Sequence, residues 1–476
     1  MEAQDYSGEH QPDLKLLVEQ YEAMLYDGGI SFLEMDSFLR LADYYEEEGD
    51  IQKAMVALDN AIKQHPYSAA LYIRKAQLCV EEEKYEQAFD ILEAAMTYEP
   101  SNLDIYLTQA DIHMRLFNQD NAIRVIRIAK SYAGADELPD LYVLESTIYE
   151  TKRDYEGALK YLKKALHADP SNNIALSRLS GLFEYIDSYE ELALFLKKLV
   201  DKEPYSYWGW YNLGLAYWYA ERWAKAAEAF DYAIVVQEKF EPAYYPCVDS
   251  LLHLNNISTA LQYLDDYKEL FEEDGELLLR YGLCYEHQKR YQEARNYYSQ
   301  ALKFGTLGGR AYHYMGNCYI EEDNWVAAEH AFLQAYSVDK YNAIFCLSLA
   351  DTYDVLDRSE QAHEFYHKAL AIDPENVEIW IHYLEFLIDE DSHSIALEIL
   401  AEAKRHLQDV LLDYAQAAIL LDSGRRQEGF VVLGSALVEA YDYNYYLYRI
   451  APRLKDDHSI GAFVANHQDD HQEENF

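Results

Sequence analysis

The sequence predicts an all-α solenoid, a stack of about eleven or twelve helix–turn–helix repeats. Alanine recurs every 34 residues through most of the chain, and a second alanine series follows the first at a distance of seven residues. The first series comprises Ala54, Ala88, Ala122, Ala158, Ala226, Ala260, Ala294, Ala328, Ala362 and Ala396, with Leu192 at one step. The second comprises Ala61, Ala95, Ala129, Ala165, Ala233, Ala301, Ala335, Ala369 and Ala403, with Leu199 and Tyr267 at two steps. Two small-residue columns in fixed phase indicate stacked units whose helices cross closely.

Each unit reads as two helices joined by a short turn, and residues 207–240 illustrate the pattern. The first helix has an apolar stripe at spacing i, i+3, i+4, i+7, formed by Trp210, Leu213, Gly214 and Tyr217. A polar turn follows at Glu221 and Arg222. The second helix has its stripe at Ala226, Phe230 and Ala233. This spacing predicts an amphipathic helix pair.

Further columns repeat from unit to unit. A small position of the first helix holds Ala42, Ala76, Ala110, Ser146, Ser180, Gly214, Gly282, Gly316 and Ala350. The aromatic position three residues later holds Tyr45, Tyr149, Phe183, Tyr217, Tyr285, Tyr319 and Tyr353. The large apolar position of the second helix holds Leu58, Leu92, Ile126, Leu162, Leu196, Phe230, Leu264, Tyr298, Phe332, Tyr366 and Leu400. Proline closes five units, at Pro66, Pro100, Pro170, Pro204 and Pro374.

The unit at 207–240 resembles the tetratricopeptide repeat, whose pattern is W-x2-L-G-x2-Y followed by A-x3-F. The resemblance spans residues 35 to about 443 and implies a right-handed α-solenoid with a concave groove lined by the first helices. Departures occur at the fifth unit, with Leu192 and Leu199, and at the seventh, with Val248, Tyr267 and Pro246. We expect altered helix crossings in these units and a kink near Pro246.

The repeats divide the chain as follows. An N-terminal capping region, 1–34, precedes an array, 35–443, with units starting near residues 35, 69, 103, 139, 173, 207, 241, 275, 309, 343 and 377, and a weaker one near 411. A capping helix over 444–467 is expected to cover the last apolar face. The acidic tail 468–476 is expected to be disordered.

Composition restricts the classes of partner. The formal net charge is −45, from 85 acids against 40 bases, which argues against nucleic acid and against anionic membranes. No apolar run is long enough for a spanning helix. Five dispersed cysteines without a C-x-x-C motif, and an N-terminus without signal-peptide features, favour a cytoplasmic protein. The acidic surface either is a solvated outer face or attracts a partner with basic flanks.

The expected groove positions form an uncharged aromatic centre between acidic ends. Acids occur in the first, tenth and eleventh units, at Asp36, Asp43, Glu46, Glu47, Asp351, Asp354, Glu378, Glu385 and Asp389. The candidate partner-binding residues lie in the fifth to ninth units: Trp208, Tyr211, Asn212, Trp218, Tyr219, Tyr245, Arg178, Arg280, Arg310, His313, Tyr314 and Asn317. Aromatic rings, arginines and an asparagine amide suit an extended peptide or helix. The structural alternative is that Trp208 and Trp218 pack against the adjacent unit.

We therefore expect a non-enzymatic protein-interaction scaffold or adaptor without a catalytic, metal or cofactor site. One alternative is a structural solenoid that assembles with copies of itself. A remote alternative is a zinc hydrolase, because His363, Glu364 and His367 match H-E-x-x-H. That helix, however, already carries the packing columns Ala362 and Ala369 of an ordinary repeat.

Overall fold

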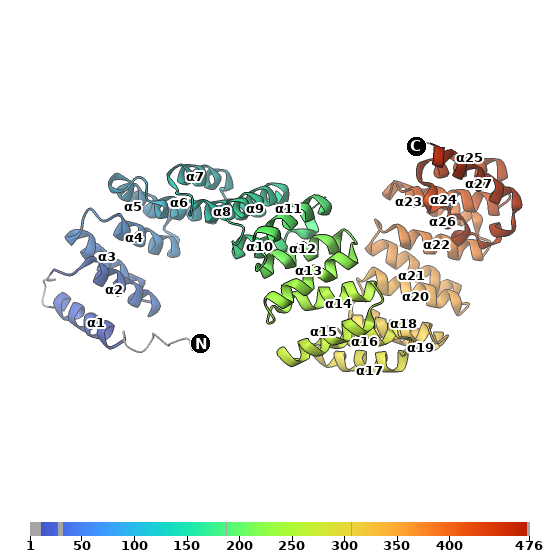
Figure 1. The fold of residues 1–476 in the computed structure, drawn as a ribbon, viewed down its shortest axis with the longest axis horizontal. Helices are drawn as coiled ribbons and strands as arrows, with labels where there is room; N and C mark the ends of the chain where they lie inside the picture. Colours follow the sequence, from blue (N-terminus) through green and yellow to red (C-terminus); the bar gives the residue numbers. More distant parts are fainter. Residues whose placement is uncertain (1–10, 27–31, 187, 306, 474–476) are drawn as a thin grey trace. The chain divides into compact units, whose positions relative to one another are not determined.

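The computed structural model describes residues 11–26, 32–186, 188–305 and 307–473. Over these residues the chain forms 27 α-helices and five short 3-10 helices, and no strand (Figure 1). The predicted all-α solenoid of paired helices is thereby confirmed. Residues 1–10 and 27–31 of the expected N-terminal cap, and residues 474–476 of the tail, lie outside the described residues.

The chain divides into two compact parts, residues 1–246 and 247–476. The first part contains α1 (Gln11–Tyr26), α2 (Met35–Glu47), α3 (Ile51–Gln64), α4 (Ala69–Glu81), α5 (Tyr85–Tyr98), α6 (Leu103–Arg115), α7 (Gln119–Tyr132), α8 (Leu138–Thr151), α9 (Tyr155–Ala168), α10 (Asn173–Ser180), η1 (Phe183–Tyr185), α11 (Tyr189–Lys202), α12 (Tyr207–Tyr219), α13 (Trp223–Val236) and η2 (Glu241–Ala243). The boundary falls within α14 (Tyr244–His253).

The second part continues the alternation of first and second helices. It contains α15 (Ile257–Leu270), α16 (Gly275–His287), α17 (Tyr291–Ala301), η3 (Leu302–Phe304), α18 (Gly308–Ile320), α19 (Trp325–Val338), α20 (Ala343–Val355), α21 (Ser359–Ile372), α22 (Val377–Asp389), α23 (His393–His406), α24 (Val410–Asp422), α25 (Arg426–Ala440), η4 (Tyr441–Tyr443), α26 (Tyr445–Ile450), η5 (Pro452–Asp456) and α27 (His458–Glu473).

Outside the fifth repeat, the turn inside each repeat contains a residue with left-handed backbone. The φ angle is +77° at Gly49 and +83° at Gly424. The non-glycine members are Glu83, Phe117, Arg153, Glu221, Asn255, Lys289, Asp323, Asp357 and Asp391. The next residue donates its N–H back to the first helix, as in the 2.8 Å bond from Arg222 N to Tyr217 O. This bond satisfies a carbonyl that the helix end would otherwise leave open, which is how a Schellman turn ends a helix.

Close approach of the two helices explains the small position of the first helix. Gly214 lies against the ring of Phe230, which is fully buried, and a Cβ added at Gly214 would stand 2.5 Å from two ring carbons. Gly282 meets Tyr298 and Gly316 meets Phe332 in the same way. The partner is sixteen residues further along the chain each time, so the small column and the large apolar column are the two halves of one contact.

The turn between repeats is closed by an aromatic donor. Trp210 Nε1 donates to the carbonyl of Pro204 at 2.8 Å, and Trp380 Nε1 donates to the carbonyl of Pro374 at 2.9 Å. Proline ends the second helix, and its carbonyl is then bonded by the first helix of the next repeat. The recurring proline therefore marks a helix boundary and also supplies the carbonyl that the Trp or Tyr six residues later bonds.

The atypical units differ where the sequence departs from the pattern. The first helix of the fifth unit stops at Ser180, and η1 follows it. In the seventh unit, η2 precedes α14, and Pro246 lies in the first turn of α14, where a helix needs no N–H donor.

The C-terminal cap differs from the single helix expected over 444–467. It is divided into α26, η5 and α27, because Pro452 cannot continue α26. The backbone of residues 468–473, which the sequence predicts to be disordered, continues α27.

We predict that Gly214→Ala destabilises the protein. Alanine normally stabilises a helix interior by about 0.5–1 kcal/mol relative to glycine. Here the added methyl group must displace the Phe230 ring, and overpacking of this kind costs about 1–3 kcal/mol. Urea unfolding followed by circular dichroism measures the change.

Gly434→Ala in α25 is the matched control, because its nearest contact, 3.5 Å from Phe463, leaves room for a methyl group. That variant is expected to be neutral or stabilised. Adding Phe230→Leu to Gly214→Ala should recover part of the loss. A stabilised Gly214→Ala protein would contradict the close-contact explanation.

Candidate partner-binding surface

Two of the predicted aromatic residues on α12, Trp208 and Tyr211, lie in one cluster with Phe240. The ring centroids of Trp208 and Phe240 are 4.8 Å apart and those of Tyr211 and Phe240 are 5.4 Å apart. The ring centroids of Trp208 and Tyr211 are 5.8 Å apart, and all three ring pairs pack edge to face. Trp208 and Tyr211 are partly buried, and burial raises the pKa of Tyr211. Each ring therefore has both a packing role and an accessible portion.

Trp218 and Tyr219 end the same helix. The ring of Tyr219 stacks on Phe183 at 5.6 Å and on Tyr189 at 5.1 Å, so it fills the seam with the preceding repeat. Trp218 is partly buried beside Tyr219 and Trp223, at 5.2 and 5.7 Å. Its indole N–H is shielded from solvent and has no hydrogen-bond acceptor among the described residues. A buried donor without an acceptor costs free energy.

Asn212 is fully buried and is not part of an accessible surface. Its Nδ2 donates to the carbonyl of Leu176 at 3.0 Å and to that of Trp208 at 2.8 Å. The amide therefore ties α12 to α10 of the preceding repeat. The expectation that Asn212 bonds a peptide backbone is corrected: its buried amide bonds the backbone of its own chain.

The predicted arginines are held by acids of their own part. In the first part, Arg178 forms a bidentate ion pair with Glu150, and its shorter contact is 2.7 Å.

Tyr245 lies in the first turn of α14 and is partly buried.

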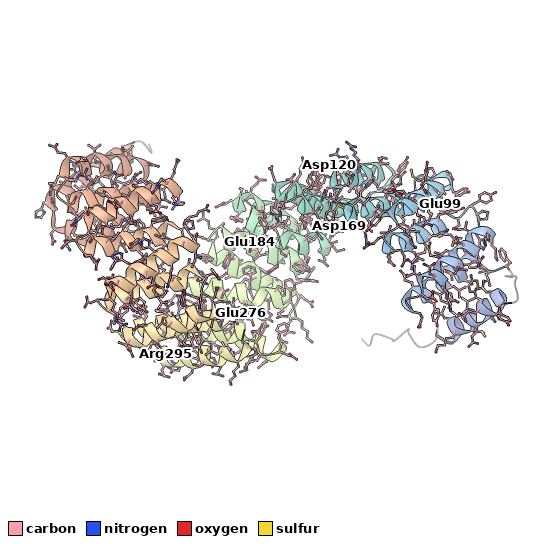
Figure 2. The ribbon with its side chains drawn as sticks, turned by 180° about the vertical axis from the view of Figure 1, so that it is seen from behind. Glu99, Asp120, Asp169, Glu184, Glu276 and Arg295 are labelled. Atoms are coloured by element: carbon pink, nitrogen blue, oxygen red, sulfur yellow. The ribbon has the colours of Figure 1, made fainter. Side chains whose placement is uncertain are left out.

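In the second part, Arg280 binds Asp249 at 2.8 and 2.9 Å and Glu276 at 2.6 Å. Glu276, labelled in Figure 2, also accepts from Arg310. The side chain of Arg280 is only 14% exposed, whereas that of Arg310 is 44% exposed. Arg310 is thus the more accessible of these two cations, and neither lacks a carboxylate.

The remaining predicted residues of the second part lie on α18. His313 Nε2 is 2.9 Å from Ser348 Oγ, and the ring packs against Phe332 and Phe345, both at 5.4 Å. Burial lowers the pKa of His313 to about 4, so the imidazole is neutral at pH 7. Tyr314 contacts Tyr298 at 5.4 Å, and Asn317 is partly buried. His313 therefore serves as an uncharged packing and hydrogen-bonding group.

Four cations of the first helices share an arrangement that sequence reasoning missed. They reach back to acids on the first helix of the preceding repeat: Arg74 to Asp43 and Glu46, Arg178 to Glu150, Arg280 to Asp249, and His382 to Asp351. The two partners are 28 or 31 residues apart in the chain. This recurring spacing was present in the sequence and indicates that most of these cations connect neighbouring repeats.

The H-E-x-x-H segment forms a packing network. His363 Nδ1 is 2.9 Å from the hydroxyl of Tyr383, and His367 Nε2 is 3.1 Å from the same hydroxyl. Glu364, the would-be general base, pairs instead with Lys368 at 2.6 Å. Both imidazoles contact one buried tyrosine and the glutamate is paired with a lysine, an arrangement unlike a zinc site with a catalytic glutamate.

None of the described helices combines the length and the apolar content that a membrane crossing requires.

Tetratricopeptide-repeat family models match residues 36–78, 69–102, 139–172, 248–308 and 343–376. The chain is 22% identical over 260 residues to the BBSome complex member BBS4 of Bos taurus, an alignment that covers 50% of this chain and 48% of that protein. The chain thus spans about half the length of this curated relative.

Two solved structures are similar at low identity. A chain in the crystal structure of the APC/C hetero-tetramer Cut9–Hcn1 has a TM-score of 0.40 and 16% identity, and the match covers 90% of this chain and 94% of that one. A tetratricopeptide repeat protein from Parabacteroides merdae has a TM-score of 0.30 and 13% identity, with 59% and 97% covered. With the repeat columns and the paired helices, the five family matches show that this chain contains tetratricopeptide repeats.

Proposed function

We propose that the protein is a non-enzymatic scaffold or adaptor that binds an extended or helical segment of a partner protein on the surface of α12. The observation that carries this proposal is the charge-free aromatic composition of α12, whose partly buried rings include Trp208, Trp218 and Tyr219. Tryptophan and tyrosine supply contact area at low entropic cost, which is why they dominate binding hot spots.

The indole N–H of Trp218 offers a hydrogen-bond donor for the partner. This N–H has no acceptor among the described residues, so a partner that offers a carbonyl after a small rotation of the ring would satisfy it. Asn212, Arg178 and Arg280 are left out of the proposed contact because each is already held by its own chain. The anchor is therefore aromatic.

Acidic first helices in the second part supply the proposed long-range attraction. Asp351 accepts from Tyr366, Glu378 from Tyr446, and Glu385 pairs with Arg449. Asp354 and Asp389 make no ion pair among the described residues, and burial together with the charges of Asp389 and Asp351 raises the pKa of Asp354 to about 6. These acids would attract a partner that carries basic residues and would speed association at low salt.

Replacing Trp208 and Trp218 with alanine should abolish partner capture while helical content is retained. The experiment is affinity capture followed by mass spectrometry and by titration of the identified segment. Loss of both anchors is expected to weaken binding at least about 100-fold, as for hot-spot pairs. Tyr205→Ala is the matched control, because this aromatic residue is 87% exposed at an inter-repeat turn.

Unchanged affinity of the Trp208→Ala, Trp218→Ala variant for a partner of the wild-type protein would contradict the proposed site. Light scattering over a concentration series tests the structural alternative: reversible growth in mass without a partner would favour self-assembly over an adaptor.

Asp354→Asn should stabilise the protein at pH 7 and lose that advantage at pH 4. The folded pKa of about 6 exceeds the ordinary value of 3.8, so the folded state holds the proton more tightly and stability falls as pH rises through this window. The asparagine variant removes that loss, and solvent screening of a partly exposed group limits the gain to about 1 kcal/mol.

Thermal unfolding at the two pH values measures this effect. Glu375→Gln, at an exposed turn position, is the control and should show no such difference. If Asp354→Asn and the wild type have equal stability at pH 7, the acidic surface is not under electrostatic strain.

A further inference from the structure

We infer that Asp391, His393 and Asp422 form a binding site for a divalent transition-metal ion of the Zn²⁺ class in the second part of the chain. One ligand atom from each side chain can be chosen so that all three lie within 4.8 Å of one another. Imidazole and carboxylate are ligands that Zn²⁺ uses in proteins. None of the three residues belongs to the H-E-x-x-H segment, whose His363 pairs with the neighbouring Glu390 at 3.5 Å.

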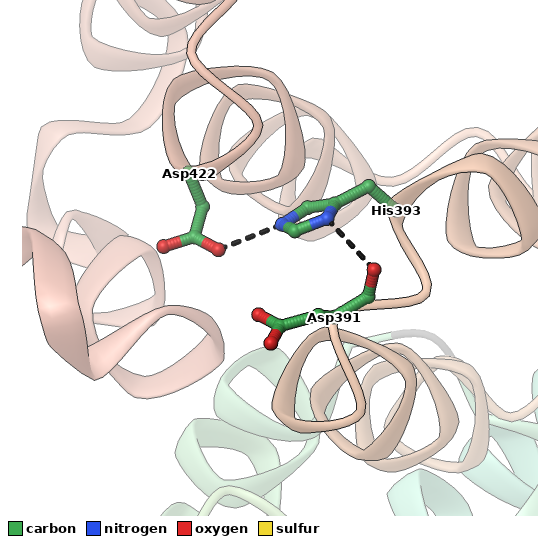
Figure 3. A group of neighbouring side chains, drawn as sticks. All are labelled: Asp391, His393 and Asp422. Carbon is green, nitrogen blue, oxygen red and sulfur yellow. Dashed lines mark hydrogen bonds and ion pairs between the residues drawn. The ribbon is translucent and has the colours of Figure 1, made fainter.

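Three elements bring these side chains together (Figure 3). Asp391 lies in the turn between α22 and α23, where its backbone is left-handed at a φ of +55°. His393 is the first residue of α23, and Asp422 is the last residue of α24. A bound ion would therefore connect the start of α23 with the end of α24, across the junction of the last two repeats.

The environment of His393 supplies the chemical argument. Nδ1 is 3.1 Å from the backbone carbonyl of Asp391, and Nε2 is 2.8 Å from Oδ2 of Asp422. Both ring nitrogens thus face oxygen atoms that only accept, whereas a neutral imidazole carries a single N–H. With Nδ1–H donating to the carbonyl, the usual orientation of a metal-binding histidine, the contact between Nε2 and the carboxylate needs a cation: a proton or a metal ion.

Asp422 increases this need for positive charge. Its side chain is only 6% exposed, so the carboxylate has little water to solvate it. It also stands at the C-terminal end of α24, where the helix dipole is negative and a cation is favoured. Metal coordination would neutralise the buried carboxylate, with His393 as a neutral ligand through Nε2.

Arg453 of η5 now supplies positive charge at the edge of the site. Its Nη1 is 2.5 Å from Asp391 Oδ1 and 3.9 Å from Asp422 Oδ2, and it holds the pKa of Asp391 below its usual value. Asp389, at the end of α22, also interacts electrostatically with this guanidinium. The Arg453 and Asp391 side chains are 55% and 68% exposed, and such exposed pairs are weak, so a metal ion can displace the arginine.

The test is isothermal titration of the metal-free full chain with ZnCl₂, supported by visible absorption after titration with Co²⁺. We expect one site above the weak background of an acidic surface, with cobalt bands that report imidazole ligation. His393→Gln and Asp422→Asn should each weaken binding by about tenfold or more. Asp391→Asn, which tolerates the left-handed backbone, should weaken it less because this carboxylate is the most exposed.

Two further variants make the result specific. His363→Gln should leave zinc binding unchanged, which separates this site from the H-E-x-x-H segment. Arg453→Gln should tighten binding by several-fold because it removes the competing cation, whereas a purely structural role for Arg453 would lower the thermal midpoint without tightening. The proposal is overturned if zinc binding survives His393→Gln, if it is lost in His363→Gln, or if Arg453→Gln weakens it.

Discussion

The contact between a small residue on the first helix and a large apolar residue sixteen positions later determines how each repeat packs. Gly214 against Phe230 and Gly282 against Tyr298 leave no space for a methyl group, so the two helix axes are drawn together at one point. The neighbouring alanine columns, such as Ala226 and Ala233, are fully buried for the same reason. The sixth, eighth and ninth repeats use this contact, and successive helices pack on one another within each part of the chain.

Most of the fold could be predicted because packing in a repeat protein is periodic. A residue type that is needed at one helix crossing is needed again 34 residues later, so the columns reveal the crossings directly. Left-handed turn residues were harder to foresee: the series contains Phe117, Lys289 and Glu83, none of which signals a positive φ on its own. The hydrogen bond that follows each of them, such as Arg290 N to Tyr285 O, fixes this conformation instead.

The candidate site was less predictable, since the groove positions of a repeat also serve its neighbours. Asn212 matched a peptide-binding residue by position, yet its amide bonds Leu176 and Trp208 of the same chain. Arg178 and Arg280 were expected to face a partner and are paired with acids of the preceding first helix. The packing of the C-terminal cap could not be predicted for a different reason. Arg449 bonds Glu378, which lies 71 residues earlier, and this separation is not a multiple of the repeat length.

The folded-back C-terminus has a consequence for growth of the array. Leu447 and Ile450 of α26 are fully buried, and α26 packs on α22 and α24, so the final repeat has no bare apolar end. A second molecule that stacked on α22 and α24 would have to displace these side chains. It would also have to break the bonds that Glu378 makes with Tyr446 and Arg449. Within the described residues, α26 thus covers the faces of α22 and α24 on which a further helix pair would otherwise stack.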